Sequence, residues 1–556
     1  MLKTYTYPKY HYQRPPELDA AGARRPVLIV GAGPVGLTAA LDCHLHGIPA
    51  IVIDDDDTVS VGSRGLCYAK RALEVLDRVG VGQAVVDKGV EWNVGRTFFR
   101  DKEVYSFNLL PEPDHKRPGM INLQQYYLEE YLVNRCNEVG IEIRWKNKVV
   151  SVTPADDRVS LQVETADGVY GIECDWLIVC DGARSPIRTM MGLDIDGKIF
   201  MDRFLIADVV MKADFPAERW FWFDPPFHPN QSVLLHREAD NVWRIDFQLG
   251  WDADPQAEKQ PERVIPRIQA MLGKDREFEL EWVSVYTFQC RRMNRFNHGR
   301  VMFAGDAAHQ VSPFGARGAN SGVQDTDNLI WKLKLVIDGK APAKLLDTYS
   351  DERCWAADEN ILNSTRSTDF ITPKSNASKQ IRTAVLQLAQ KHAFARKLVN
   401  SGRLSVPAYY TGSALNTPDS DSFAGMMEPG APMDDAPVRV NGHDPADQWL
   451  LDHVGNRFQA LLFADDVATL DGSQLRALAE GGGGQFPVQP VVITPGSKAV
   501  PGILTLQDVK GRFAQRYDAR DGTVYLARPD QHVAARWRSL DLASIRAAVL
   551  RATCNA

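Results

Sequence analysis

The sequence lacks most features of membrane, secreted or nucleic-acid-binding proteins. Its eight cysteines are scattered, and no pair has a CxxC or metal-ligand spacing, so we expect free thiols and no metal site. No basic tail or stripe offsets the net charge of −7, which argues against nucleic-acid binding. The N-terminal residues lack the apolar stretch of a secretory signal, and Asp42, His44 and His46 interrupt the apolar run of residues 27–53. These absences predict a cytoplasmic protein without a membrane span.

What is present is typical of a large globular enzyme. A chain of 556 residues is too long for one core and predicts two to four domains. Its hydrophobic content of 44% and charged content of 24% are ordinary for an enzyme. Residues 1–25 are rich in aromatic, proline and charged residues, so we expect an extended arm. It would lie on the body of the protein or on a partner subunit, and a homodimer is possible.

The first motif that carries chemistry is a glycine-rich turn. An apolar strand over residues 26–30 is followed by GAGPVG, a helix over 37–46 and a second strand over 49–53. Asp54 ends that strand, 23 residues after Gly31 (54 − 31). In this setting the glycines admit a pyrophosphate at the helix start, and the carboxylate binds a ribose. The predicted dinucleotide-binding residues are Gly31, Gly33, Pro34, Val35, Gly36 and Asp54.

A second motif spans residues 301–333. A short apolar strand over 301–304 ends at Gly305 and Asp306, and a loop rich in Gly, Pro and Ser follows. A helix is expected to begin near Gly318, because apolar residues then recur at helical spacing. Its free N–H groups and dipole favour an anion. A strand end with a carboxylate beside such a helix predicts a flavin site.

Two further helices are expected between these motifs, over residues 69–79 and 123–136. Arg64 precedes the first, and Gln125 lies near the start of the second. Taken alone, these residues are equally well explained as a solvated arginine and a helix-cap glutamine.

The remaining segments differ in character from the glycine-rich half. Residues 199–290 alternate apolar and polar positions and are rich in large aromatics, which predicts an antiparallel sheet. Such a sheet could roof a pocket, although most of its aromatics could equally be core residues. A polar linker over 411–435 precedes a small α/β domain over 436–556.

Four motifs together carry a resemblance to a known family. They are GAGPVG (31–36), CDGARSPIR (180–188), AGDAAH (304–309) and PFGARGANSGVQDTDNLIWKL (313–333). In this order they resemble the FAD-dependent aromatic hydroxylases, the single-component flavoprotein monooxygenases. The segments VYTFQCRRMNRF (285–296) and DARDGTVYLARPDQHVAARW (518–537) are similar to the 3-(3-hydroxyphenyl)propionate hydroxylase and phenol hydroxylase branch.

The resemblance implies an α/β fold with three domains after the arm. A split Rossmann-like FAD-binding domain would comprise residues 26–198 and 291–410. An antiparallel-sheet substrate domain would be inserted at 199–290, and a thioredoxin-like domain, here without a CxxC, would comprise 436–556. Because every motif precedes Leu333, we expect the last domain to serve assembly or stability and its removal to leave the FAD site intact.

The resemblance also assigns roles to individual residues. Asp181 is associated with both FAD and the pyridine nucleotide, and Asp306 would bind the ribityl chain. Arg317 stands where many relatives have Gln; it would hold an acidic substrate or a nicotinamide phosphate, or only lie near the flavin. The implied FAD contacts are Gly31, Gly33, Pro34, Val35, Gly36, Asp54, Arg64, Gln125, Val149, Asp181, Gly305, Asp306, Gly318, Ala319 and Asn320.

The implied reaction is hydroxylation of a phenolic substrate in aromatic compound catabolism, with NAD(P)H, O₂ and a C4a-hydroperoxyflavin. It needs a base near the phenol oxygen. The Asp that this branch uses has no evident counterpart near Leu66, so Tyr286 and His236 are the candidates, although either could be an ordinary strand residue.

Three other classes compete with this function. The alternative is an epoxidase or Baeyer–Villiger monooxygenase acting on a polycyclic or other aromatic metabolite. A flavin halogenase is disfavoured because the WxWxIP signature is absent. A non-catalytic FAD-fold carrier would need no aromatic roof.

Overall fold

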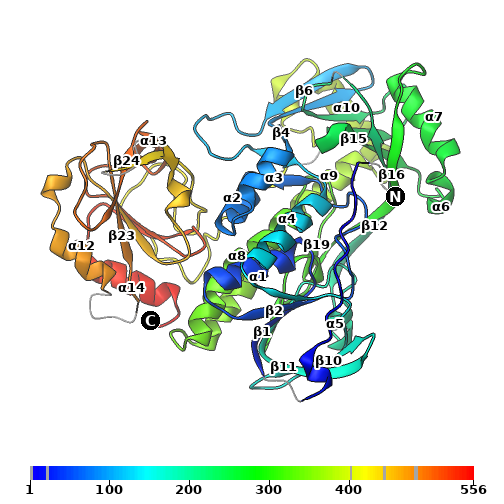
Figure 1. The fold of residues 1–556 in the computed structure, drawn as a ribbon. Helices are drawn as coiled ribbons and strands as arrows, with labels where there is room; N and C mark the ends of the chain where they lie inside the picture. Colours follow the sequence, from blue (N-terminus) through cyan, green and yellow to red (C-terminus); the bar gives the residue numbers. More distant parts are fainter. Residues whose placement is uncertain (1–3, 21–23, 214, 401–403, 442–445, 481–485) are drawn as a thin grey trace.

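The computed structural model describes residues 4–20, 24–213, 215–400, 404–441, 446–480 and 486–556. Figure 1 shows three parts: a sheet with helices at the lower right, a second sheet at the upper right, and a C-terminal part on the left. Both glycine-rich motifs lie in the first part.

The first part is built on a mostly parallel sheet. Its main strands are β1 (Arg25–Val30), β2 (Ala50–Ile53), β8 (Glu142–Arg144), β11 (Gly168–Val179), β17 (Asn297–His298) and β18 (Val301–Phe303). Their order is β17-β18-β11-β1-β2-β8, and β1 is parallel to both β2 and β11. The ends of β1, β11 and β18 therefore meet at one edge, which is where this fold class binds its ligands.

Three helices pack beside this sheet: α1 (Pro34–Leu45), α4 (Gln125–Glu138) and α8 (Gly318–Ile337). The sequence placed α1 and α4 to within three residues at each end, and it placed the start of α8 at Gly318, which is confirmed. β9 (Lys148–Pro154) and β10 (Val159–Thr165) extend the sheet from β11. The turn at Asp167-Gly168 joins β10 to β11.

The second sheet has the order β19-β16-β12-β15-β14-β13-β5-β6. Its strands are β5 (Val94–Phe99), β6 (Lys102–Asn108), β12 (Asp196–Val210), β13 (Arg219–Phe223), β14 (Ser232–Arg237), β15 (Val242–Leu249), β16 (Glu279–Arg292) and β19 (His309–Gln310). The predicted antiparallel sheet over 199–290 is present, but β5 and β6 come from outside that range. β5 pairs in parallel with β13, and every second residue of β5 is buried. α6 (Pro255–Glu258) and α7 (Pro261–Leu272) accompany this sheet.

The C-terminal part contains a third sheet, ordered β21-β20-β24-β23-β22-β25-β26. Its elements are β20 (Pro437–Val440), β21 (Gln448–Trp449), β22 (Gln459–Phe463), α12 (Gly472–Ala479), β23 (Gln489–Thr494), β24 (Leu504–Asp508), α13 (Arg512–Arg516), β25 (Val524–Ala527), β26 (Val533–Trp537) and α14 (Leu542–Ala552). β22 is parallel to β23 and antiparallel to β25. Trp331 and Leu345 of the first part are buried in the same apolar cluster as residues of this sheet.

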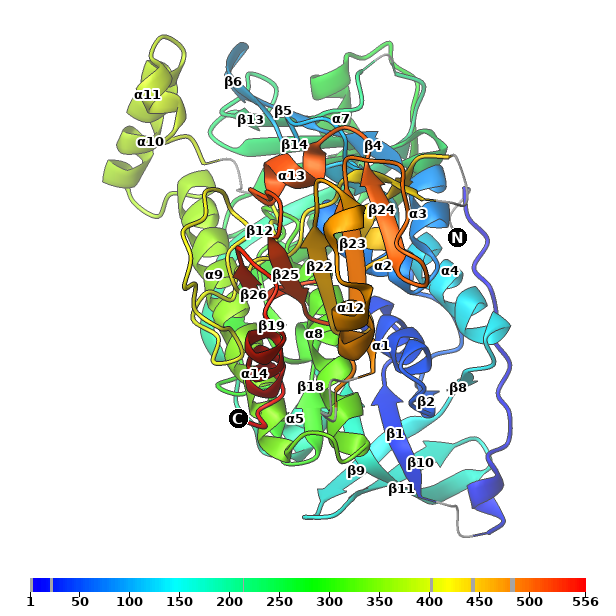
Figure 2. The same ribbon diagram turned by 90° about the vertical axis from the view of Figure 1, so that its left-hand side faces the viewer.

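Other helices and strands of the described residues lie outside these three sheets. They are β3 (Cys67–Ala69), α2 (Lys70–Arg78), α3 (Gly82–Lys88), β4 (Val90–Trp92), β7 (Met120–Asn122), α5 (Pro186–Met190), α9 (Asp347–Ile371), α10 (Asn376–Ala389) and α11 (Ala393–Arg396). α8 packs against α9, and α10 and α11 project from the body at the upper left of Figure 2.

The described part of the N-terminal arm, residues 4–20, lies on the body. Tyr5 stacks on Tyr126 with a ring-centroid distance of 4.2 Å, and the Thr4 N–H donates to Glu281 of β16 at 2.9 Å. The arm thus connects the first part to the second sheet. Within the described ranges, no helix has the length and apolar character needed to cross a membrane.

Candidate functional site

At two of the three glycines of the GAGPVG turn, a side chain would clash with neighbouring backbone atoms. At the third it would not. A Cβ on Gly36 would lie 1.9 Å from the Gly31 carbonyl oxygen, and a Cβ on Gly31 (φ +109°) would lie 2.3 Å from that of Cys180. A Cβ on Gly33 would meet nothing within 4 Å. Gly33 precedes Pro34, the first residue of α1, so the open space lies at the helix N-terminus, where a phosphate binds best.

Asp54 stands beside this turn, at the end of β2. Its carboxylate accepts hydrogen bonds from the N–H groups of Ala32 (2.5 Å) and Asp56 (2.8 Å). Burial raises its pKa to about 6, although both N–H groups oppose the shift. A half-buried carboxylate next to the phosphate turn fits a ribose of a dinucleotide.

The second motif places Asp306 near the start of α8. A Cβ on Gly318 would lie 3.8 Å from Asp306 Oδ1. The Asp306 side chain is reached by solvent, yet desolvation by the surrounding protein raises its pKa, against the effect of His309. The Asp306 carboxylate is therefore reached by solvent but enclosed by protein on its other sides, so it lies in a depression. Gly305 (φ +61°) packs against Val35 of α1, so the two motifs touch.

The side chains of Asn320 and Arg317 hold α8 in place. Asn320 Oδ1 accepts from the Ala69 N–H at 2.7 Å, and its Nδ2 donates to the Cys67 carbonyl at 2.8 Å. Buried Arg317 donates to Asn360 Oδ1 at 2.6 Å. For a ligand at this helix start, the backbone of Gly318 and the half-buried Ala319 therefore matter more than these two side chains.

The other predicted FAD contacts lie in three places. The Gly65 N–H donates to Gln125 Oε1 at 2.7 Å, next to exposed Arg64. Val149 is buried in β9. Asp181 follows β11; its Oδ2 accepts from the Ile187 N–H at 3.1 Å, while its Oδ1 is buried without a hydrogen-bond partner among the described residues. Burial raises the Asp181 pKa.

One face of the second sheet is turned toward the second motif. Phe314, which lies just before α8, has ring-centroid distances of 5.0 Å to both Phe204 and Phe288. Tyr286 is the cross-strand partner of Phe204, so it lies on the same face. These aromatics therefore cover the segment from which α8 begins.

The protein environment shifts the pKa of both predicted base candidates. Burial, together with Arg219 and Arg244, lowers the pKa of His236 well below its usual value. Burial, together with Asp246, raises the pKa of Tyr286 well above its usual value. His236 is therefore a weak base, and Tyr286 keeps its proton.

Sequence reasoning missed Asp246, a buried carboxylate on this face. Gln248 pairs with Phe204, and Asp246 is two residues away on β15, so both point to the same side. Burial raises the pKa of Asp246 to about 7. Its Oδ1 is buried and has no hydrogen-bond partner within the described ranges. The sequence feature that could have identified Asp246 is an acidic residue at an inward-facing position of an apolar strand.

Residues 24–364 match the protein-family model described as an FAD binding domain. The chain belongs to this family of flavoproteins. The resemblance drawn from the four motifs is thereby confirmed.

Relatives of this flavoprotein are flavin-dependent monooxygenases. A 3-(3-hydroxy-phenyl)propionate/3-hydroxycinnamic acid hydroxylase of Mycolicibacterium gilvum is 26% identical over 92% of the chain and 88% of the relative. The 6-methylpretetramide 4-monooxygenase of Streptomyces rimosus is 30% identical over 81% of each chain. The crystal structure of the flavin-dependent monooxygenase PieE with FAD and substrate has a TM-score of 0.80 at 23% identity, covering 97% of this chain and all of that one. The chain is thus an FAD-dependent oxidoreductase of the monooxygenase type.

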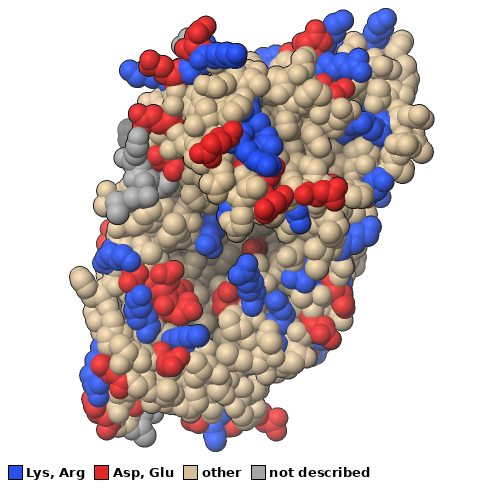
Figure 3. Space-filling model, turned by 90° about the vertical axis from the view of Figure 1, so that its right-hand side faces the viewer, with Lys and Arg blue, Asp and Glu red and all other residues tan. Residues whose placement is uncertain are grey.

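The surface of the flavoprotein is hollowed on the side that Figure 3 shows. The hollow lies midway up that face, and side chains of both charges, Lys and Arg as well as Asp and Glu, stand at its rim.

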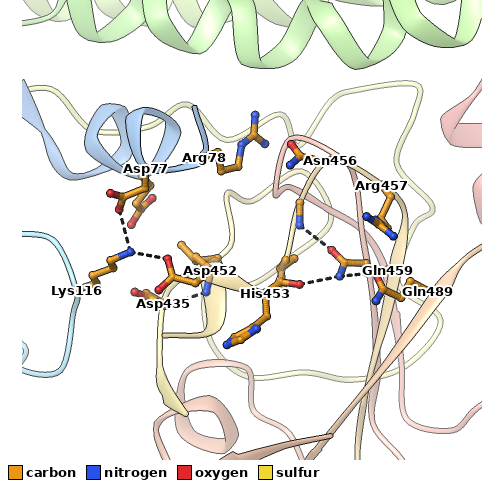
Figure 4. A pocket seen from close by; sticks show the side chains of 14 residues that line it. Asp77, Arg78, Lys116, Asp435, Asp452, His453, Asn456, Arg457, Gln459 and Gln489 are labelled. Atoms are coloured by element: carbon orange, nitrogen blue, oxygen red, sulfur yellow. Dashed lines mark hydrogen bonds and ion pairs between the residues drawn. The ribbon is translucent and has the colours of Figure 1, made fainter. Parts of the chain in front are cut away.

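A separate cavity of about 380 Å³ lies between α2 and the C-terminal part of the flavoprotein. Figure 4 shows that charged side chains lining it pair with one another. Lys116 Nζ lies 2.5 Å from Asp452 and 3.4 Å from Asp77. None of the predicted FAD or base residues lines this cavity. We therefore regard it as a polar interface between α2 and the C-terminal part.

Proposed function

We propose that this flavoprotein hydroxylates a phenolic ring, using NAD(P)H and O₂. The observation that carries the proposal is Asp246, a buried carboxylate with an unpartnered oxygen on the sheet face that covers the start of α8. A base whose pKa lies near the working pH is effective at removing a phenol proton. A phenolate is rich enough in electrons at the ring positions next to and opposite its oxygen to accept an oxygen atom.

The residues of the two motifs support an extended FAD. Gly31, Gly33 and the α1 N-terminus would bind the pyrophosphate, and Asp54 would bind the adenosine ribose. Asp306 would bind the ribityl chain, and the backbone at Gly318 would face the isoalloxazine. Bound FAD would supply the redox chemistry, by which electrons from NAD(P)H and one oxygen atom of O₂ would reach the substrate.

The other side chains of this face have supporting roles in the proposal. Phe204, Phe288 and Phe314 would exclude water from the oxygen-transfer step. The Tyr286 hydroxyl, which keeps its proton, would donate a hydrogen bond to the substrate oxygen. We assign Arg317 to holding α8, because its guanidinium donates to Asn360 Oδ1.

The domain plan is also part of the proposal. The order β26-β25-β22-β23, with β22 parallel to β23 and antiparallel to β25, supports a thioredoxin-like C-terminal domain. The pairing of β5 with β13 supports a substrate domain that includes residues 94–108 as well as 199–290.

The test is NAD(P)H consumption and product analysis across hydroxybenzoates, hydroxyphenyl acids and polycyclic phenols. The last group is included because a relative acts as a 6-methylpretetramide 4-monooxygenase. A matching substrate should gain one oxygen next to or opposite its hydroxyl. Its methoxy analogue should not be hydroxylated, but it should still permit some NAD(P)H oxidation, with peroxide release. Efficient oxygenation of the methoxy analogue would instead favour the epoxidase or Baeyer–Villiger alternative.

A further inference from the structure

The loop between β25 and β26 of the C-terminal part packs against α8 and α9 of the FAD-binding part. Its residue Arg528 is fully buried and donates two hydrogen bonds to Glu352 of α9, at 2.7 and 2.9 Å. The same guanidinium donates to Asp530 at 2.6 Å. Glu352 also accepts from Lys332 of α8 at 2.8 Å. The loop therefore joins the C-terminal part to both helices behind the flavin motif.

From α9 the hydrogen bonds continue to the end of β18. Arg353, which follows Glu352, donates to Asp325 Oδ1 at 2.6 Å. The other oxygen of Asp325 accepts from the Gly305 N–H at 2.8 Å and lies 2.7 Å from His309 Nε2. Gly305 immediately precedes Asp306, the proposed ribityl contact.

A second route from the same loop reaches Arg353. The His532 ring lies against the Tyr410 ring, with 4.7 Å between centroids. The Tyr410 hydroxyl accepts from Arg353 Nη1 at 2.7 Å. Two contacts of one loop thus converge on the arginine that holds Asp325.

Burial makes this network sensitive to the loss of one member. Arg528, Glu352, Arg353 and Asp325 are each at most 3% exposed, so water does not screen them. Removing one partner of a buried pair leaves the other charge uncompensated, which is far more disruptive than losing a surface pair. The effect is expected to pass along the connected residues.

We propose that Arg528 is a positioning residue for the flavin. Through Glu352 and Arg353 it fixes Asp325, which holds the Gly305–Asp306 segment against the ribityl chain. The C-terminal domain would then support the FAD site through α8 and α9, without touching the cofactor. This inference rests on the proposed function, specifically on the ribityl role of Asp306.

The test compares Arg528→Lys with Arg536→Lys in the full-length protein. Arg536 is a matched control: it is a buried arginine of β26 whose bidentate partner, Asp419 at 2.6 and 3.0 Å, lies in the linker. FAD is titrated into each apoprotein while flavin fluorescence is followed, and thermal unfolding is recorded in parallel. We expect about tenfold weaker FAD binding in Arg528→Lys, which corresponds to about 1.4 kcal/mol. The control should change FAD affinity less than about twofold, whatever its effect on Tm.

A gentler variant keeps the test decisive if Arg528→Lys does not fold. Tyr410→Phe removes only the hydroxyl that accepts from Arg353, and it should weaken FAD binding without unfolding the protein. In addition, Arg528→Lys combined with Asp306→Asn should lose less affinity than the product of the two single losses, because both act on one contact.

The outcomes separate this inference from the proposed function. Wild-type protein that binds no FAD would overturn both. Wild-type protein that binds FAD, with unchanged affinity in folded Arg528→Lys or in Tyr410→Phe, would overturn only the positioning role. An equal loss in Arg536→Lys would also overturn it, because general destabilisation of the domain would then explain the effect.

Discussion

At the residue scale, the three glycines of the phosphate turn differ in what surrounds them. Gly31 and Gly36 are required by neighbouring backbone, whereas Gly33 faces open space at the start of α1. The sequence motif alone could not predict this difference, because all three residues are glycine and the difference lies in the atoms around them.

This difference makes Gly33→Ala a direct test of cofactor binding. The added methyl meets no protein atom within 4 Å, so the apoprotein should fold and unfold like the wild type. The methyl would occupy the space of the pyrophosphate, and FAD affinity should fall by about tenfold or more. Fluorescence titration and thermal unfolding measure the two effects.

Gly36→Ala is the matched comparison. Its methyl would lie 1.9 Å from the Gly31 carbonyl oxygen, so it should lower Tm as well as FAD content. Wild-type FAD affinity in Gly33→Ala would mean that the pyrophosphate does not lie at this turn.

Asp246 leads to a prediction about pH. Several charged or titratable groups interact with it electrostatically: Arg244, Asp208, Arg219, Glu238, Cys67 and Tyr286. Since the base must be ionised, kcat/KM should rise with pH through an apparent pKa near 7. Asp246→Asn should lose this rise and most of its activity while keeping FAD.

The same shift predicts the pH dependence of stability. The folded pKa of about 7 lies above the ordinary value of 3.8, so the folded state holds the proton more tightly than the unfolded state. Asp246 should therefore lower wild-type stability as pH rises from about 4 to 7. We expect the Tm of Asp246→Asn, relative to that of the wild type, to be higher at pH 8 than at pH 5. A pH-independent difference would contradict the raised pKa.

At the element scale, α8 is held by a side chain that the resemblance assigned to the flavin. Asn320→Ala would leave the buried Ala69 N–H and Cys67 carbonyl without their partners. We expect a cost of about 2–6 kcal/mol, because each of the two unsatisfied groups costs about 1–3 kcal/mol. Thermal unfolding of the apoprotein measures it.

Gln324→Ala is the control for this helix. Gln324 is one turn further along α8, and its side chain donates to the Asn320 carbonyl within the same helix. It should be less destabilising than Asn320→Ala. An equal effect would mean that α8 is not anchored mainly through Asn320.

Elements with a local signature were predicted well, and those formed by distant pairing were not. The turn at Gly31, the strand ending at Asp54 and the helix beginning at Gly318 each follow from residues close together in the sequence. The place of β5 in the second sheet depends on β13, more than one hundred residues away. Asp246 was missed for a related reason, since its importance depends on which face of the sheet meets Phe314.

At the scale of the whole molecule, the structure argues against a dispensable C-terminal domain. Every motif precedes Leu333, but Trp331 and Leu345 are buried against that domain, and Glu352 is paired with Arg528. Removing residues 436–556 should expose this apolar surface and leave part of the buried charge uncompensated.

We therefore expect residues 1–435 alone to aggregate or to be recovered without FAD. Gel filtration and the flavin absorbance of the purified protein measure this, with the full-length chain as control. A monodisperse, yellow truncated protein would show that the FAD-binding part is independent, as the sequence motifs alone had suggested.

The Arg528–Glu352 pair also has a consequence for the timing of biosynthesis. The two residues are 176 positions apart, and ribosomes add about 5–20 residues per second, so Glu352 waits on the order of ten seconds for its partner. During that interval α8 and α9 lack their contacts with the C-terminal part. The nascent chain should therefore acquire its cofactor only after the last strands have left the ribosome, which makes loading of the flavin a late, post-translational event.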